Sequence, residues 1–287
     1  MKLACFRAKK GGRPALGVYT GDGIIEVKGR LAAKYPSIRA VIANNGFGEI
    51  AKWAKGKKPD HRLTRVRYLP PLWDAEKVIC VGVNYPKRHP VEGKLLPPPE
   101  HITLFAKWEG ALVGHGEPLQ QPKGAAADTF DYEGELVLVI GKDCRDVPKA
   151  KAMQALAGFT ILNDGSVRGW QKHSVPAGKN FTASGASGPC FVTRDEIEDV
   201  AAMRLSTRLN GEQVQSATVA DMIFDIPTIV EYVSGIMRLK PGDIIATGSP
   251  AGSGGSRQPQ RFLKAGDELE IEWSGVGVLK NKVKAAK

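Results

Sequence analysis

The stretch Asp131-Tyr132-Glu133-Gly134-Glu135, followed directly by the apolar run 136–140, decides how the rest of this 287-residue chain is interpreted. The branched residues of that run predict a strand, which a Gly-Lys-Asp turn ends. A strand that already begins at Tyr132 presents Glu133 and Glu135 on one face, because strand side chains alternate with a period of two. Adjacent carboxylates repel each other, so the pair indicates either a solvated edge or a bound cation.

A third acid favours the cation. Asp164 follows Asn163 at the end of a second strand-like run, 158–162. Carboxylate oxygens suit magnesium, manganese and calcium, whereas zinc more often takes nitrogen and sulfur ligands. Glu133, Glu135 and Asp164 therefore predict a site for magnesium or manganese, or for calcium in a crystal.

The composition is ordinary for a globular protein, with 42% apolar and 25% charged residues. No apolar run approaches the ~18 residues that a membrane helix needs, and the first ten residues carry too short an apolar stretch for a signal peptide. The cysteines are widely spaced and form no C-x-x-C pair, which argues against disulfides and a thiolate zinc site. We therefore expect a cytoplasmic protein without a membrane partner.

The formal net charge of +11 raises the question of nucleic-acid binding. Basic residues are dispersed, apart from small clusters at 55–58, 62–67 and 280–287, and no helix-turn-helix, zinc-finger or RNA-binding signature accompanies them. A scattered surplus is typical of a solvated surface or of a field that attracts anionic substrates. We expect no nucleic-acid partner, and a basic binding protein is the non-enzymatic alternative.

The chain is expected to form two domains. Residues 1–70 predict a small α+β domain, with strand-like segments followed by helical patterning: 3–7, 16–20, 24–27, 39–43 and 49–55. Proline-containing segments at 56–59 and 69–72 form the linker. Residues 71–287 form the larger domain, in which strands outnumber short helices, so the predicted fold class is α+β and rich in β-structure.

A series of short motifs follows along the larger domain. They are Val81-Gly82-Val83-Asn84-Tyr85, Asp131-Tyr132-Glu133-Gly134-Glu135, Asn163-Asp164-x-Ser166-x-Arg168-x-x-Gln171, Gly178-Lys179-Asn180-Phe181, Ser187-Gly188-Pro189, Asn210-Gly211-Glu212-x-x-Gln215, Pro241-Gly242-Asp243-x-Ile245 and Thr247-Gly248-Ser249-Pro250. In this order, over about residues 77–285, they resemble the fumarylacetoacetate hydrolase family in its two-domain bacterial type.

The resemblance implies a fold in which strands roll into an incomplete barrel or sandwich, usually as a homodimer. It implies a divalent metal held by Glu133, Glu135 and Asp164, the acids that the charge argument also selects. Relatives of this type act on 2-oxo acids or their enols, as acylpyruvate hydrolases, oxaloacetate decarboxylases and isomerases of aromatic catabolism. A metal-chelated 2-oxo acid forms its enolate more easily when a bond at C3 breaks.

The resemblance also implies roles for single residues. Lys179 matches the family's active-site lysine, which stabilises the enolate; without the motif it would be interpreted as a solvated loop residue. Arg168 and Gln171 match positions that contact or orient the substrate, although Arg168 also fits a structural ion pair. Tyr85 and Thr247 are candidates for hydrogen bonds to the substrate.

The water-activating pair departs from the family pattern. Hydrolytic relatives commonly place a histidine, with a glutamate three residues on, shortly after the Asn-Tyr pair. His89 and Glu92 have that internal spacing, but His89 stands four residues after Tyr85 where three are expected. The other candidate bases are His115, His173 and Glu109.

We expect hydrolysis of a carbon–carbon bond in a 2,4-dioxo acid, which gives pyruvate and a carboxylic acid, with His89 and Glu92 as the base. Decarboxylation or isomerisation of a related 2-oxo acid is the alternative, because neither reaction needs an activated water. The irregular segment 86–100 is rich in proline, glycine and charge, which is typical of a lid. Specificity for the substrate's tail is expected in 86–101 and 248–260.

Overall fold

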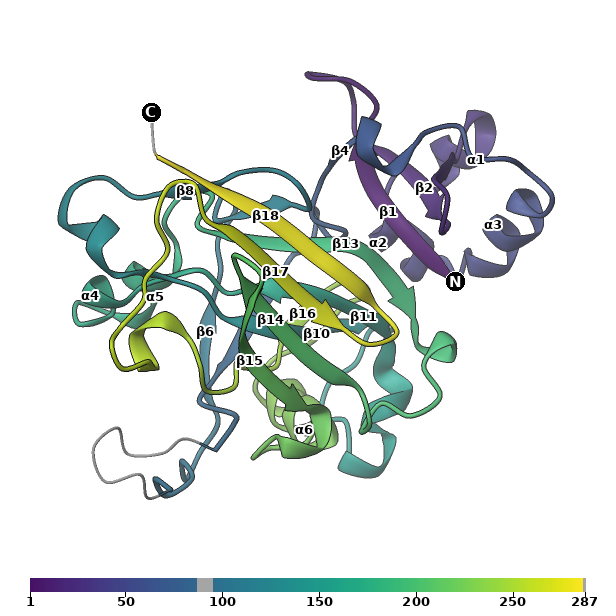
Figure 1. Ribbon diagram of the computed structural model, residues 1–287. Coiled ribbons are helices and arrows are strands. Elements are labelled where there is room, and N and C mark those ends of the chain that lie inside the picture. Colours follow the sequence, from purple (N-terminus) through teal and green to yellow (C-terminus); the bar gives the residue numbers. More distant parts are fainter. Residues whose placement is uncertain (87–94, 286–287) are drawn as a thin grey trace.

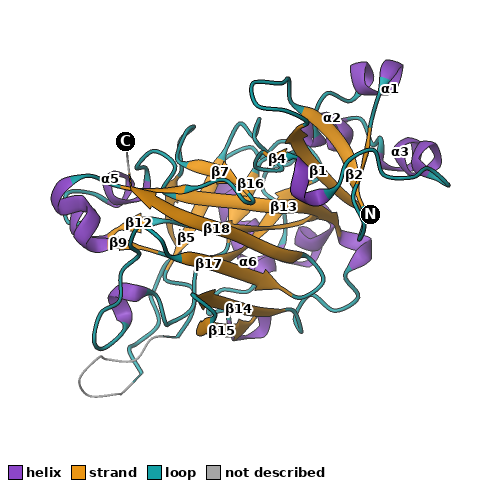
Figure 2. Cartoon of the chain, turned by 45° about the horizontal axis from the view of Figure 1, so that its top comes forward, coloured by secondary structure: helices purple, strands orange, loops and turns teal. Residues whose placement is uncertain are grey.

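A computed structural model of the chain describes residues 1–86 and 95–285. An 11-stranded mixed sheet forms its centre (Figures 1 and 2). Its main path runs, in spatial order, through β3 (Ile24–Glu26), β2 (Ala15–Tyr19), β1 (Lys2–Arg7), β13 (Gly185–Thr193), β11 (Leu156–Asn163), β10 (Gly134–Ile140), β16 (Ile244–Ala246), β5 (Val78–Gly82) and β6 (Thr103–Ala106). Two short strands join from the side: β4 (Arg67–Tyr68) pairs with β1, and β7 (Leu112–Gly114) pairs with β13.

A second, five-stranded sheet lies against the first. Its order is β15 (Glu212–Thr218), β14 (Arg204–Leu209), β17 (Glu268–Trp273), β18 (Gly277–Ala285) and β8 (Leu119–Gln121), while β9 (Phe130–Asp131) pairs with β12 (Ser166–Val167) separately. The helices are short: α1 (Gly29–Lys34), α2 (Ile38–Ala43), α3 (Phe47–Ala54), α4 (Arg168–Gln171), α5 (Val175–Lys179) and α6 (Ile226–Ile236). Isolated 3-10 turns occur at 63–65, 124–129, 149–155, 194–196, 219–221 and 254–256. The predicted β-rich α+β fold is confirmed.

The apolar run of the opening motif is β10, and its packing explains why the run is continuous. Leu136, Leu138 and Ile140 belong to the core that the second sheet covers, whereas Val137 and Val139 face a second core on the opposite side. A strand buried on both faces reads as unbroken apolar sequence. In β17 only alternate residues are buried, because its other face is more open to water.

The first 70 residues share both a sheet and a core with the rest of the chain. β1 pairs antiparallel with β13, where Leu3 lies opposite Phe191. Ile38 and Val41 from α2 join the same core as Val137 and Val139 of β10. The division at residue 70 stays a prediction, since shared packing does not say which part folds alone.

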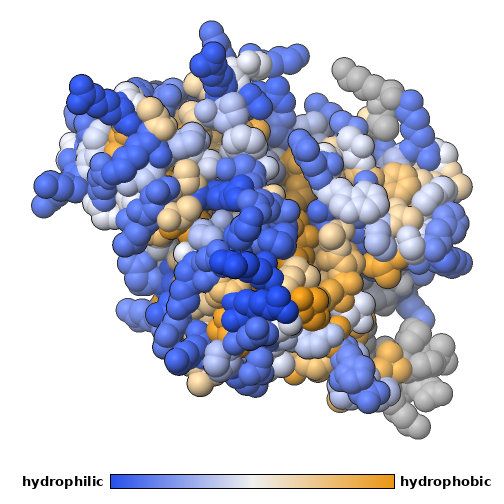
Figure 3. Space-filling model, turned by 180° about the vertical axis from the view of Figure 1, so that it is seen from behind, coloured by the Kyte–Doolittle hydropathy of each residue, from blue (hydrophilic) through white to orange (hydrophobic). Residues whose placement is uncertain are grey.

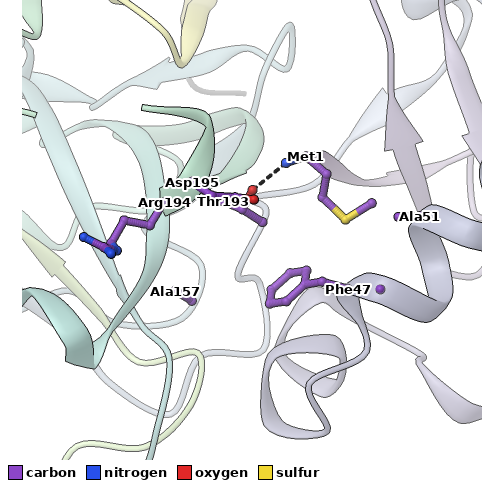
Figure 4. Close-up of a pocket in the computed structure, with 8 residues that line it drawn as sticks. Met1, Phe47, Ala51, Ala157, Thr193, Arg194 and Asp195 are labelled. Carbon is purple, nitrogen blue, oxygen red and sulfur yellow. Dashed lines mark hydrogen bonds between the residues drawn. The ribbon is translucent and has the colours of Figure 1, made fainter. Parts of the chain in front are cut away.

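A cavity of about 420 Å³ lies where these two parts of the chain meet (Figure 4). Met1 and Phe47 face Thr193 and Asp195 across it, and the Met1 ammonium donates hydrogen bonds to Thr193 and, at 2.8 Å, to Glu196. It shares no lining residue with the acidic cluster described below.

Two further sequence predictions can be compared with the structure. The Asn210-Gly211 pair is typical of a two-residue hairpin turn, and the structure confirms the hairpin, with both residues at positive φ as a type I′ turn requires. A proline at the start of a helical turn predicts a helix from Pro148 to Leu156, and the structure has a 3-10 helix there, over Lys149–Ala155.

Seen from behind, the surface is mostly hydrophilic, but apolar residues collect in a hollow at the centre of this face (Figure 3). Among the described residues, no helix is both long and apolar enough to cross a membrane.

The shared core predicts the effect of a substitution at Leu3. Leu3 is fully buried between the first 70 residues and β13, so Leu3→Ala should lower the free energy of unfolding by about 2–5 kcal/mol in chemical denaturation, with one cooperative transition. Ile236→Ala, at a side chain that is 52% exposed, should change it by less than about 0.5 kcal/mol. Two transitions, of which only the first responds to Leu3→Ala, would show independent unfolding and refute the shared core.

Candidate functional site

Three acidic side chains converge at one end of β10 and β11. Glu135 lies in β10, and Asp164 follows the last residue of β11. Glu133 lies just outside β10, because the chain changes partners there: Asp131 pairs with Ser166 in the small β9–β12 ladder, and the pairing with β11 begins at Gly134. The expected strand start at Tyr132 is therefore wrong, yet ligand atoms of the three acids lie within 4.8 Å of one another.

Backbone hydrogen bonds hold the two carboxylate-bearing segments together. The Asp164 amide donates to the Glu133 carbonyl at 2.8 Å, and the Glu133 amide donates to Asn163 Oδ1 at 3.0 Å. The second sheet presses on the residue between the glutamates, since a Cβ at Gly134 would lie 2.4 Å from Thr207 Oγ1. Glycine is required there, and the Glu-Gly-Glu order follows from this close approach.

Two buried lysines contact the acids. Lys179, from α5, places Nζ 2.6 Å from Asp164 Oδ2 and also pairs with Glu133. Lys107, just after β6, places Nζ 2.8 Å from Asp164 Oδ1 and 3.2 Å from the Gly165 carbonyl. Lys179 is therefore not a solvated loop residue. Sequence analysis missed Lys107, whose only signal is its place at the end of a strand-like run.

Arg168 bridges two acids at the edge of the cluster. Its Nε donates to Asp131 Oδ2 at 2.7 Å, and its Nη2 lies 2.7 Å from Glu133 Oε1. Because Arg168 and Gln171 also line the cavity that contains the three acids, the ion pair and a substrate contact are compatible. α4, which carries both residues, follows β12 directly.

The charges within the cluster are unequally compensated. Burial favours the neutral form of Glu133, but Arg168 and Lys179 outweigh burial and hold its pKa well below the usual range. Burial, together with the negative charges of Asp164 and Glu133, raises the pKa of Glu135 well above its ordinary value. Burial alone would lower the pKa of Lys179, but the carboxylates of Asp164 and Glu133 raise it. Glu135 is therefore the acid whose charged form is least favoured in this cluster.

The glycine-rich segment after β16 binds carboxylates of the protein itself. The Gly248 amide donates to Glu135 Oε2 at 2.9 Å, and the Gly254 and Gly255 amides donate to the two oxygens of Asp131 at 2.6 and 2.9 Å. Asp131 thus fixes both this loop and Arg168. Sequence analysis quoted Asp131 but gave it no role, because nothing in the sequence shows which amides it meets.

The cavity around the acids measures about 210 Å³, and its polar lining comprises Glu133, Glu135, Asp164, Arg168, Gln171, Lys179, Thr103 and Ser249. Thr247 does not line it; its Oγ1 is buried and donates to the Leu136 carbonyl at 3.0 Å. Tyr85 lines a neighbouring cavity.

The predicted water-activating pair, His89 and Glu92, lies outside the described residues, as does most of the predicted lid. The other candidate bases lie away from the cavity lining. His115 is largely buried, and its Nδ1 accepts a hydrogen bond from the Lys280 amide, which is a structural role. His173 is exposed beside Trp170, and Glu109 is exposed near Trp108.

The donor set fits a divalent cation. All three side chains offer carboxylate oxygens, which magnesium and manganese prefer over the nitrogen and sulfur set of zinc. A bound cation would also stabilise the ionised form of Glu135, which burial and the neighbouring carboxylates disfavour.

The fold and the site together define a β-rich protein with clustered carboxylates and buried lysines at one end of its central sheet. Residues 77–284 match the family described as the fumarylacetoacetate (FAA) hydrolase C-terminal domain. The chain therefore belongs to the fumarylacetoacetate hydrolase family, as its motifs predicted.

Similar proteins are named for several different activities. Oxaloacetate tautomerase YisK of Bacillus subtilis is 35% identical over 244 residues, which cover 82% of this chain and 80% of the relative. The solved fumarylacetoacetate hydrolase of Exiguobacterium antarcticum is 32% identical with a TM-score of 0.79, and all of both chains is covered. Maleylpyruvate hydrolase from Sphingobium sp. SYK-6, solved with manganese(II) and pyruvate, is 29% identical with a TM-score of 0.81 and the same full coverage.

The site predicts how metal binding responds to loss of Glu135. Glu135→Gln should weaken Mn²⁺ binding by at least about 100-fold in titration calorimetry, because changes even to groups behind a ligand cost 10–100-fold. In the presence of chelator at pH 7 the same variant should be more stable than the parent, since folding of the parent requires Glu135 either to keep a charge that burial and two neighbours disfavour or to take up a proton.

Glu109→Gln is the matched control, because Glu109 is exposed and does not line the cavity. It should leave both measurements unchanged. Parental Mn²⁺ affinity in Glu135→Gln would remove Glu135 from the ligand set.

Proposed function

We propose that this protein is a metal-dependent enzyme that forms and stabilises the enolate of a small anionic 2-oxo acid. The observation that carries the proposal is the pairing of the three carboxylates with Lys179 and Arg168 in one cavity. Preorganised charges aimed at a developing oxyanion are the largest contribution to many enzymatic rate enhancements.

Each group of residues in the cavity has a different proposed role. Glu133, Glu135 and Asp164 would hold the ion, which when bound supplies a Lewis acid for the 2-oxo oxygen. Lys179, which pairs with two of these acids in this structure, would supply an ammonium for the charge that develops on the enolate oxygen. Arg168 and Gln171 line the cavity and offer donors for the substrate's carboxylate.

Two arrangements hold these donors in place before a substrate binds. Asp131 fixes the Arg168 guanidinium through Nε and leaves the other end of the group facing Glu133 and the cavity. Lys107 pairs with Asp164 Oδ1, while Lys179 pairs with Oδ2, and together they orient that carboxylate. Positioned charges need no reorganisation during the reaction, which is the source of their effect.

Tautomerisation between keto and enol forms is the reaction we place first. This reaction removes a proton from C3 and adds one to the 2-oxo oxygen, or the reverse. The enolate that exists between the two proton transfers is an anion, and the cationic side chains of the described site would stabilise it. A relative that is 35% identical over most of both chains is named an oxaloacetate tautomerase, so oxaloacetate is the first substrate to assay.

Hydrolysis of a carbon–carbon bond in a 2,4-dioxo acid is the second candidate. The similar maleylpyruvate hydrolase structure favours it, as does the spacing of His89 and Glu92. It releases the enolate of pyruvate, which is also the enolate of a 2-oxo acid, but it additionally needs an attacking water and a base. Decarboxylation is the remaining variant of this chemistry.

Further expectations from the sequence belong to the proposal. We propose a cytoplasmic homodimer that uses magnesium or manganese and has no nucleic-acid or membrane partner. Tyr85 remains proposed as a hydrogen-bonding partner of the substrate, whereas Thr247 would support the site only indirectly, through its buried hydrogen bonds to the Leu136 carbonyl.

Replacement of Lys179 tests whether this lysine stabilises the enolate of the 2-oxo acid. Lys179→Met should slow Mg²⁺-dependent decay of enol-oxaloacetate, followed by its ultraviolet absorbance, by about 10²–10³-fold, the usual cost of one oxyanion-stabilising donor. Mn²⁺ binding should be retained, because lysine donates no ligand. Lys172→Met, at an exposed lysine at the end of α4, should keep the parental rate, and a parental rate in Lys179→Met would refute the proposal.

Pyruvate release from acetylpyruvate separates the two candidate reactions. If the protein is a hydrolase, the parent releases pyruvate with Mg²⁺, and His89→Ala abolishes the release because no base activates water. Rapid tautomerisation of oxaloacetate without pyruvate release assigns the tautomerase. Parental hydrolysis by His89→Ala would show that the base lies elsewhere.

A further inference from the structure

The positive charge of the protein is concentrated in its first 70 residues. They contain 16 lysines and arginines but only four aspartates and glutamates, a net charge of +12. Residues 71–287, which carry the carboxylate cluster, hold the remaining 25 basic and 26 acidic residues, a net charge of −1. The surplus therefore belongs to one part of the chain, although it forms few runs along the sequence. A charge concentrated in this way attracts anions to the part that carries it.

A cavity of about 400 Å³ lies at the border of this basic part. Part of its lining comes from Arg7 in β1, from Gly11 in the turn between β1 and β2, and from residues 67–70, which begin with β4. The other part comes from residues 112–114, 117, 118 and 120. The turn between β1 and β2 projects from the molecule near β4 (Figure 1). Because the cavity shares no lining residue with the carboxylate cavity, it is a separate site.

Two arginines line this cavity from directly opposite positions in neighbouring strands. Arg7 is in register with Arg67, and like charges in this arrangement destabilise a sheet. Arg67 is compensated, because its Nε donates to Glu117 Oε1 at 2.8 Å and its Nη2 pairs with the same carboxylate. The Arg7 guanidinium instead donates to the uncharged carbonyl of Gly12. A guanidinium has five N–H groups, so Arg7 keeps donors for a ligand.

The turn beside the cavity adds further positive charge. Lys9, Lys10 and Arg13 lie in this turn, and all three are exposed. Together with the two arginines of the lining they make five cations, against the one carboxylate of Glu117 among the lining and turn residues. A dianion offsets more of this charge than a monoanion does. Phosphate also matches the planar fork of a guanidinium with two parallel hydrogen bonds.

Much of the remaining lining is apolar and half-buried: Leu69, Pro70, Leu112, Val113 and Pro118. The two parts of the lining are in close contact, since a Cβ at Gly114 would lie 2.1 Å from the Tyr68 carbonyl oxygen. The cavity is therefore formed before a ligand binds. It offers cations for a charged group and an apolar surface for a carbon body.

We propose that this cavity binds a small organic phosphate, with the phosphate group on Arg7 and Arg67 and the organic part against the apolar lining. The volume falls in the range of about 300–1,000 Å³ that small-molecule sites occupy. Inorganic phosphate would leave the apolar lining uncovered, and a monocarboxylate would offset less of the charge. The inference does not depend on the proposed function, because the cavity and the carboxylate cluster have no lining residue in common.

Calorimetry in the presence of a metal chelator measures this site apart from the metal-dependent reaction. Phenyl phosphate should bind the parent at least about tenfold tighter than inorganic phosphate, because its ring leaves water for the apolar lining. It should also bind at least about tenfold tighter than benzoate, which has the ring but only one negative charge. Benzyl alcohol, which has the ring and no charge, should not bind measurably.

Substitutions in the cavity test where the phosphate lies. Arg7→Gln should weaken phenyl phosphate binding by about 10–100-fold, the range for one hydrogen bond to a charged group. Gln120→Glu should weaken it as well, because it places a negative charge at an exposed residue of the lining and keeps both arginines. Arg30→Gln is the matched control: it removes the same charge from the same part of the chain, at an exposed residue outside the cavity, and should keep the parental affinity.

Each other outcome overturns the inference. Absence of phenyl phosphate binding to the parent would show that the cavity is not a phosphate site. Equal weakening by Arg7→Gln and Arg30→Gln would assign binding to the general positive field. Parental affinity in both Arg7→Gln and Gln120→Glu would place the ligand elsewhere, and benzoate that binds as tightly as phenyl phosphate would replace phosphate as the recognised group.

Discussion

The structure depends on the repulsion between buried carboxylates that the fold brings together. Glu133, Glu135 and Asp164 would destabilise the end of the central sheet if they met alone, because buried charges need partners. Lys107 and Lys179 supply two cations, and Arg168 supplies a third that Asp131 shares. Among the described residues Glu135 forms no such ion pair: it accepts a hydrogen bond from the Gly248 amide, and burial together with the other two acids strongly raises its pKa. That imbalance gives the site its capacity for a divalent cation.

The rest of the fold can be understood as support for this cluster. The central sheet places the ends of β10 and β11 side by side, and the second sheet approaches so closely that only glycine fits between the two glutamates. The glycine-rich loop gives its amides to Asp131 and Glu135, which leaves none of those amides for a nucleotide phosphate. The first 70 residues complete the core behind β10. Rigid support of this kind keeps catalytic groups in place.

Sequence patterns predicted the parts of this arrangement that are local. The Glu-x-Glu pair, the acid after a second strand and the Asn-Gly hairpin follow from periodicity and turn chemistry. Lys107 could not be found, because a lysine at a strand end is usually solvated and its burial depends on distant segments. β13 was missed as well, since its Gly-Ala-Ser-Gly-Pro start has low strand propensity and its neighbours β1, β11 and β7 impose the conformation.

The most direct test of this account is a crystal structure of the protein grown with Mn²⁺, with anomalous scattering used to locate the ion. The account predicts one strong peak between Glu133, Glu135 and Asp164, with carboxylate oxygens within about 2.0–2.6 Å, and with the Lys179 ammonium turned from the carboxylates toward the substrate cavity. A saturated crystal with no peak there, or with the ion held by other residues, would contradict the account.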